Sequence, residues 1–183
     1  MKFYNYFIYI IAAFLISCSN NQKAFDDKVY FNIKSFFESE AKRLQVQKNA
    51  IRKTVEQNHQ SETKQVTITD WQNELNLFIE SDINKPSWKD SYTVNQNGST
   101  LTYLAKEEKL KTRKIVIQKS ADGKVRSILI RNKVKNYLYS SEEELTYHTD
   151  SSYQITKKQS VIFIGDNTFK VEGFFFKKNL NLQ

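Results

Sequence analysis

The second half of the chain alternates apolar and polar side chains and carries turn residues about every ten to fifteen positions. A period of two places one row of side chains on a single face of a strand. Asn97-Gly98 and Ala121-Asp122-Gly123-Lys124 are typical hairpin turns, because Asn, Asp and Gly adopt the required backbone conformations at little cost. From Trp88 onward the sequence therefore predicts an antiparallel meander sheet.

Later strands of this sheet are harder to delimit. Two shorter strands are expected around 140–144, where three consecutive glutamates predict a solvated bend. A strand over 153–161 follows, and a turn at Gly165-Asp166-Asn167 leads to a last strand over 169–176. Phe174-Phe175-Phe176 places apolar groups on both faces of that strand, so both faces need a cover.

The region before Trp88 predicts a helix and a hairpin. Between Lys28 and Gln47, apolar residues recur at three-, four- and seven-residue offsets, as on one face of a helix. Asn58-His59 then separates strand-like runs at 51–57 and 61–69, and Asn tolerates the left-handed backbone that a tight turn needs. His59 is thus expected to be an exposed turn residue.

A second helix is expected after this hairpin. Thr69 and Gln72 match a capping box, and the apolar stripe that follows extends to Ile83 before Pro86. Trp71 falls on the stripe and is expected in the core. The fold class is therefore α+β: an antiparallel meander of about eight strands, twisted or curled into a half-barrel, with two covering helices. This outline is similar to periplasmic lipoprotein carriers of the LolA and LolB type, at the level of fold alone.

The first eighteen residues have the order of a secretory signal peptide. A lysine near the start precedes an apolar run from Phe7 to Ile16, which is shorter than the roughly 20 residues of a membrane-spanning helix. Leu15-Ile16-Ser17-Cys18 resembles the lipobox of bacterial lipoproteins, in which the cysteine is diacylated and becomes the first mature residue. The resemblance implies a signal peptide at 1–17, a lipidated Cys18 with a tether to residue 27, and one globular domain over 28–183.

The residues after Cys18 bear on the membrane in which the domain would be anchored. In lipoprotein families an Asp directly after the cysteine signals inner-membrane retention, whereas this chain has Ser19. Frequent Asn, Lys, Ile, Phe and Tyr resemble the style of Bacteroidota lipoproteins, but Asp26-Asp27 match the acidic surface-export signal of that group poorly. The resemblance therefore implies the outer membrane, facing the periplasm.

Charge and cysteine content limit the expected partners. The chain is basic, with a formal net charge of +8 and a pI of about 9.4. Its lysines and arginines alternate with acids, which predicts solvated faces and not a nucleic-acid-binding stripe. The expected partners are the membrane, through acylated Cys18, and a lipid or envelope protein, with no nucleic acid. With no second cysteine, stability must come from packing.

No motif in the sequence names a reaction. Four glycines are too few and too scattered for a phosphate-binding loop or a dinucleotide fingerprint. His59 and His148 lack the spacing of zinc ligands, so neither a metal nor a cofactor is expected. His148 and Asp150 share a strand face and could form an oriented pair, but a hydrolase would need a nucleophile from elsewhere. A non-catalytic protein is the expectation.

The aromatic side chains are the remaining lead. Core packing and cross-strand pairing are their ordinary role. The functional alternative is an apolar groove for an acyl chain or a peptide, lined by Tyr92, Tyr103, Tyr137, Tyr139 and Tyr147.

Three functions thus stay open. They are a lipoprotein that binds an apolar ligand or a protein partner, a structural or assembly accessory protein, and a hydrolase with dispersed catalytic residues. A wide aromatic pocket would favour the first, a filled core with exposed apolar groups the second, and a cleft at His148 the third.

Overall fold

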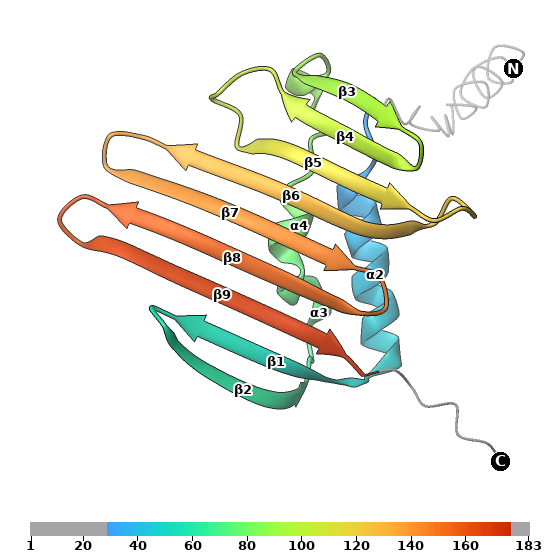
Figure 1. Ribbon diagram of the computed structural model, residues 1–183, viewed down its shortest axis with the longest axis vertical. Helices are drawn as coiled ribbons and strands as arrows, with labels where there is room; N and C mark the ends of the chain where they lie inside the picture. Colours follow the sequence, from blue (N-terminus) through green and yellow to red (C-terminus); the bar gives the residue numbers. More distant parts are fainter. Residues whose placement is uncertain (1–28, 177–183) are drawn as a thin grey trace, which may run out of the picture.

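Nine antiparallel strands form one open sheet in the computed structural model, which describes residues 29–176 (Figure 1). The strands are β1 Ala50–Gln57, β2 Gln60–Thr67, β3 Tyr92–Asn97, β4 Thr100–Ala105, β5 Thr112–Lys119, β6 Val125–Lys135, β7 Tyr139–His148, β8 Ser152–Val161 and β9 Gly165–Phe175. Their order is β2-β1-β9-β8-β7-β6-β5-β4-β3. The expected α+β meander is confirmed, with nine strands in place of about eight, and the sheet does not close.

The chain reaches the two edges of the sheet by crossing one of its faces. The first hairpin, β1–β2, forms one edge, and the helical segment after it leads to β3 at the other edge (Figure 1). The meander then returns strand by strand until β9 pairs with β1, so that Ile51 lies opposite Phe175. Segments from the two ends of the domain therefore hold each other in register.

The first predicted helix is present as α2, Ile33–Gln47. It starts later than expected because Asn32 caps it, its side chain accepting a hydrogen bond from the Ser35 amide. Its apolar stripe is packed against the sheet, and Ile33 and Phe37 are fully buried. The expected signal peptide, Cys18, the tether and Lys28 lie outside the described residues.

The second predicted helix is two short helices, α3 Trp71–Glu74 and α4 Asn76–Ile79, followed by a 3-10 turn η2, Pro86–Trp88. The capping residue is Asp70 and not Thr69, because the Asp70 carboxylate reaches the Asn73 amide at 2.9 Å. Leu75, at φ −96° and ψ 10°, separates the two helices. Trp71 is nevertheless buried in the core, as expected, with 2% of its surface exposed.

The core fills the space between the helices and one face of the sheet. Aromatic rings form its centre, with Phe37 and Phe78 stacked at 4.6 Å and Tyr147 edge-on to Phe37 at 5.2 Å. Isoleucines of β5 and β6 are completely buried beside them. Among residues 29–176, no helix lies over the opposite face of the sheet (Figure 1). The side chains on that face are mostly polar.

Two strand assignments from the sequence are wrong. The glutamate run is no bend: residues 142–144 lie in the middle of β7, where a period of two sends Glu143 to the helix side and its neighbours to the open side. The last turn comes at 162–164, and Gly165 already begins β9. The cover that the terminal phenylalanines need is provided on the helix side by Trp71 against Phe175, and on the open side by the Arg52 guanidinium, 5.0 Å from the Phe174 ring.

Candidate functional site

The five tyrosines predicted to line a groove do not lie together. Three of them, Tyr92, Tyr103 and Tyr147, belong to the buried core. Tyr139 is half-buried at the start of β7, and Tyr137 is 88% exposed in the loop before it. The hydroxyls of the buried ones are used internally: Tyr92 donates to the Thr112 carbonyl at 2.9 Å, and Tyr103 accepts from the Phe31 amide at 2.9 Å. These three rings stabilise the fold and do not border an open groove.

Two core tyrosines hold helix carboxylates against the sheet. Tyr147 donates to Glu40 of α2 at 2.6 Å, and Tyr153 donates to Glu74 of α3. Burial raises the pKa of Tyr147 far above its usual range, and the Glu40 charge raises it further. Burial and the Glu74 charge also raise the pKa of Tyr153. Both hydroxyls therefore stay protonated and serve as structural donors.

The histidines do not form a catalytic pair. His148 points to the open face of the sheet, opposite Ser127 and Ser152. Asp150, in the following turn, forms an ion pair with Arg43 of α2, with 2.7 Å between Nη1 and Oδ1. His59 is the exposed turn residue that the sequence predicts, at φ 70°. Within residues 29–176, no three His, Cys, Asp or Glu side chains are grouped to hold a metal ion.

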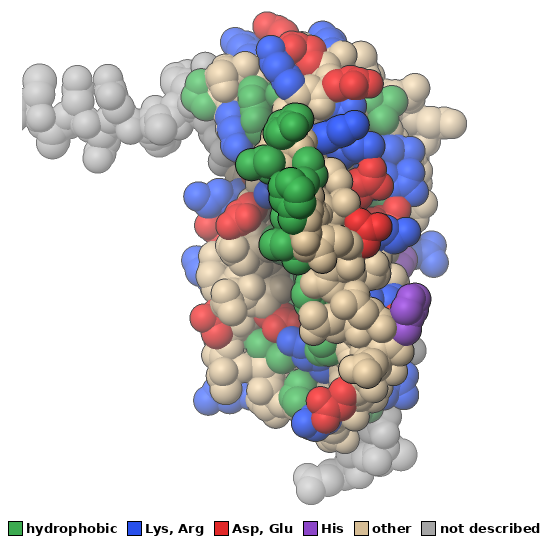
Figure 2. Space-filling model, turned by 90° about the vertical axis from the view of Figure 1, so that its left-hand side faces the viewer, with side chains coloured by type: hydrophobic (Ala, Val, Ile, Leu, Met, Phe, Trp, Pro, Cys, Tyr) green, Lys and Arg blue, Asp and Glu red, His purple; other side chains and the backbone are tan. Residues whose placement is uncertain are grey.

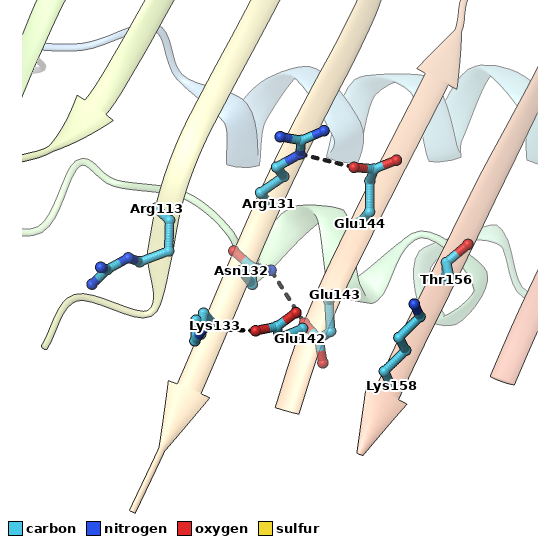
Figure 3. A pocket seen from close by; sticks show the side chains of 9 residues that line it. All are labelled: Arg113, Arg131, Asn132, Lys133, Glu142, Glu143, Glu144, Thr156 and Lys158. Atoms are coloured by element: carbon cyan, nitrogen blue, oxygen red, sulfur yellow. Dashed lines mark hydrogen bonds and ion pairs between the residues drawn. The ribbon is translucent and has the colours of Figure 1, made fainter. Parts of the chain in front are cut away.

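The open face of the sheet has a shallow hollow of about 500 Å³. Across β6 and β7, Arg131 pairs with Glu144 at 2.8 Å and Lys133 with Glu142 at 2.7 Å (Figure 3). The pairing with Lys133 lowers the pKa of Glu142. Lys158 lies on the neighbouring strand, β8. These exposed charges largely neutralise one another, because the Glu142 and Glu144 carboxylates are each held in an ion pair across the strands.

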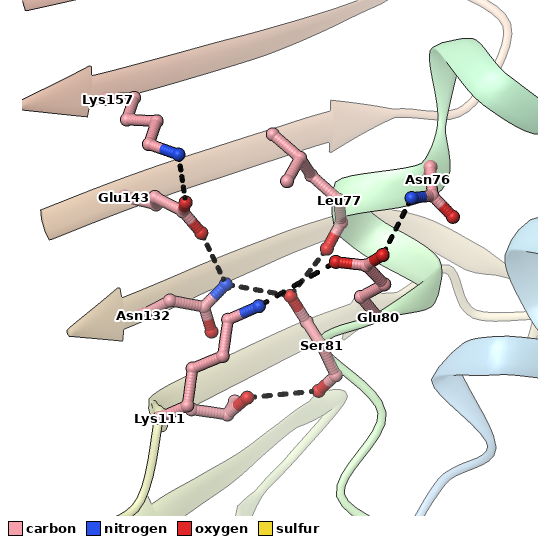
Figure 4. A network of polar contacts seen from close by, with 9 residues as sticks. Asn76, Leu77, Glu80, Ser81, Lys111, Asn132, Glu143 and Lys157 are labelled. Atoms are coloured by element: carbon pink, nitrogen blue, oxygen red, sulfur yellow. Dashed lines mark hydrogen bonds and ion pairs between the residues drawn. The ribbon is translucent and has the colours of Figure 1, made fainter. Parts of the chain in front are cut away.

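A polar network on the helix side of the same strands is buried. Asn132 donates to Ser81 at 2.8 Å and to Glu143 at 3.2 Å, and Lys157 pairs with Glu143 at 3.2 Å (Figure 4). The Ser81 hydroxyl in turn donates to the Leu77 carbonyl of α4 at 2.7 Å. The network ties the segment after α4 to β6, β7 and β8, which is a positioning role.

A second hollow, of about 580 Å³, lies between the end of α2, β1 and the end of β9. Trp71, Phe175 and Phe176 contribute to its lining, together with the Arg43 and Asp150 side chains. None of the five predicted tyrosines lines it. The indole N–H of Trp71 has no hydrogen-bond partner within the described residues.

Six of the exposed large apolar side chains gather where the hairpins β6–β7 and β8–β9 turn (Figure 2). We call this surface the apolar tip; it consists of Val134, Tyr137, Leu138, Ile162, Phe163 and Ile164. Phe163 is 100% exposed and Ile164 84%. The two turns are joined by a hydrogen bond of 3.1 Å from the Ile162 amide to the Leu138 carbonyl, so they form one surface.

The turn that carries Phe163 is conformationally unfavourable. Residues 161–164 form a tight turn closed by the Ile164 amide and the Val161 carbonyl at 3.1 Å, with Phe163 in its third position at φ 72°. That position normally takes Gly or Asn, because a Cβ there is disfavoured. An unfavourable backbone that displays a fully exposed aromatic ring is typical of functional surfaces. The sequence analysis missed this site, although the run Val161-Ile162-Phe163-Ile164 is visible in it.

No helix among residues 29–176 is long and apolar enough to cross a membrane.

Comparisons of the chain with known proteins identify no relative. No protein-family model matches the sequence, and comparison with curated proteins and with solved structures returns no significant match. The functional argument therefore rests on the geometry of the chain itself.

Proposed function

We propose that this chain is a lipid-anchored protein of the bacterial outer membrane, facing the periplasm, and that its domain is a non-catalytic docking module. The anchor is Cys18, which the lipobox-like Leu15-Ile16-Ser17 precedes. The docking surface is the apolar tip. Its large apolar groups are exposed together on one end of the sheet, which is the observation that carries the proposal (Figure 2).

Three features favour docking over catalysis. The space between helices and sheet is filled by packed aromatic rings, and Asp150 is paired with Arg43 instead of His148. The charges of the open face are paired across the strands. The apolar tip, in contrast, exposes apolar side chains to water, and none of them belongs to the core. Stability of the fold therefore does not explain these residues, whereas binding to a partner does.

The anchor is tested by Cys18→Ala and by globomycin, which blocks signal-peptide cleavage of lipoproteins. Both should leave unprocessed precursor. Normal processing and membrane attachment of the variant would refute the lipoprotein assignment.

The docking surface is tested in the same cells by photocrosslinking. A benzoylphenylalanine at Phe163 should give an adduct, whereas the same probe at Val46 should not. Val46 is the matched control because it is 82% exposed on α2, away from the apolar tip. Equal labelling at both positions, or none at either, would refute docking through the tip.

A second candidate is an apolar ligand, such as an acyl chain, in the hollow beside Trp71. The lining aromatic rings of Trp71, Phe175 and Phe176 favour it. Native mass spectrometry of the protein purified from cells should then show a lipid adduct that Trp71→Ala reduces. Absence of an adduct, with no measurable affinity for fatty acids, would refute this candidate.

A further inference from the structure

We propose that the occupant of the apolar tip is a membrane surface with anionic headgroups, into whose interface the two turns insert. This inference rests on the proposed docking function and names its partner. Four features of the tip carry it: its two exposed turns, its internal hydrogen bonds, its aromatic residues and the lysines of the adjoining strands.

The apolar tip is made of two exposed turns at one end of the sheet, where Figure 2 shows apolar side chains gathered. Phe163 and Ile164 lie in the turn of one hairpin, and Tyr137 and Leu138 lie in the turn of the next. Neither described hollow is lined by any of these four residues. A lipid interface accepts such turns without a matching cavity, and the apolar area buried there provides the binding free energy.

The backbone of the turns is largely hydrogen-bonded within the tip. The Asn136 side chain accepts from the amides of Leu138 and Tyr139, both at 2.9 Å, and the Asn136 amide donates to the Tyr139 carbonyl at 2.8 Å. The amides of Ile162 and Ile164 donate to carbonyls of the same two hairpins at 3.1 Å. Peptide groups that enter hydrocarbon must be satisfied internally, so these hydrogen bonds reduce the cost of inserting the turns.

The residues around the apolar tip fit a headgroup layer. Tyr137 has the amphipathic ring that is typical of membrane interfaces. Four lysines lie on β6 and β8, the strands that lead into the two turns. Lys133 and Lys157 pair with glutamates, whereas Lys135 and Lys158 form no ion pair within residues 29–176. The nearest acid in sequence to Phe163 is Asp166, at the start of β9. Lysines close to an anionic surface strengthen binding and make it dependent on salt.

The test uses the chain from Ser19 to Gln183, which keeps every strand, helix and core side chain that the structure describes and omits the apolar leader. It also has no cysteine, so Phe163→Cys supplies a single site for an environment-sensitive fluorophore. With vesicles of phosphatidylcholine and about 30% phosphatidylglycerol, which is an anionic lipid, the label should shift to the blue. A label at Val46→Cys should not shift.

Binding is measured by co-sedimentation with the same vesicles. Phe163→Ser with Ile164→Ser should weaken it about tenfold or more, since two large side chains leave the apolar phase. Val46→Ser should leave it unchanged. Lys135→Glu with Lys158→Glu should remove the preference for anionic over neutral vesicles, and Lys42→Glu, a charge change on α2, should not. Circular dichroism checks that each variant is folded.

Two outcomes would overturn the bilayer as the occupant. One is the absence of vesicle binding and of any shift at position 163. The other is binding that the tip variants leave unchanged. If Phe163 nevertheless crosslinks to a protein in cells, the docking function stands and its partner is a protein; if it crosslinks to nothing, both proposals fail.

Discussion

Gly173 is the position where one methyl group should do the most damage. It lies in β9 directly opposite Tyr153 of β8, on the helix side of the sheet. An added Cβ would stand 2.5 Å from the Tyr153 ring carbon Cζ and 2.8 Å from its hydroxyl oxygen. Carbon atoms in good contact are roughly 3.5–4.0 Å apart. The backbone of Gly173 is not left-handed, so space alone requires the glycine.

The ring has no free direction in which to move. Tyr153 is 1% exposed, packs against Trp71 and Phe175 with centroids 6.1 Å away in each case, and donates to Glu74. Overpacking a filled core costs about 1–3 kcal/mol. Loss of a hydrogen bond to a charged group adds about 1.5–3 kcal/mol if the hydroxyl is displaced. We therefore expect Gly173→Ala to reduce the free energy of unfolding by about 3 kcal/mol, which lowers Tm by roughly 6–12 °C.

A double-mutant cycle isolates the cause. Tyr153→Leu vacates the space above Gly173, and alanine is intrinsically better than glycine within a strand by about 0.5–1 kcal/mol. In that background Gly173→Ala should be neutral or slightly stabilising. Urea unfolding of the chain from Ser19, followed by tryptophan fluorescence and circular dichroism, measures all four variants. A loss below about 0.5 kcal/mol in the native background, or an equal loss in both backgrounds, would refute the steric argument.

Three further predictions concern charge, pH and the apolar tip. Glu143→Ala should reduce the free energy of unfolding by about 3 kcal/mol, because it leaves Lys157 and Asn132 without their buried partner. Glu142→Ala, at an exposed ion pair, should reduce it by at most about 1 kcal/mol. Similar losses for the two variants in urea unfolding would contradict this prediction. The pKa values of Tyr92, Tyr103, Tyr147 and Tyr153 are raised in the folded state, so the unfolded chain loses these protons first. Stability should therefore be unaffected by ionisation of these four tyrosines below about pH 10 and fall above it; ionisation of the four core tyrosines before unfolding, measured by absorbance at 295 nm beyond the change due to the tyrosines outside the core, would oppose it. Phe163→Gly should stabilise the fold by about 1 kcal/mol, because glycine adopts the positive φ without strain. The same change should weaken docking, because it removes the exposed ring. A loss of stability in thermal unfolding would count against the assigned strain.

Features that depend on neighbouring residues could be predicted from the sequence. The hairpin at Asn58-His59 forms as expected, with φ of 47° and 70°, and Gly98 and Gly123 also have positive φ at the predicted turns. The stripe of α2 is buried as its spacing requires. In these cases the backbone preference of a turn residue or the period of apolar positions is sufficient evidence.

Features that depend on distant partners were misjudged. Three consecutive glutamates suggested a bend, but strand β7 sends Glu143 to Asn132 and Lys157 and leaves Glu142 to Lys133. Asp150 suggested a partner for His148, yet Arg43 of α2 binds it. The last turn was predicted at Gly165-Asp166-Asn167, whereas the apolar residues 162–164 form it and Phe163 has a positive φ there.

The sequence by itself determined an antiparallel meander with covering helices, and it predicts a lipid anchor at Cys18. Both are encoded by residues close together in the chain, through strand alternation, turn chemistry and the order of charged and apolar residues. Only the tertiary structure decided that β1 pairs with β9, that most of the predicted tyrosines serve the core, and that two turns meet in the apolar tip. The reason is that exposure is a property of the packed molecule: the same apolar run is core when a helix covers it and exposed surface when it ends a hairpin in water.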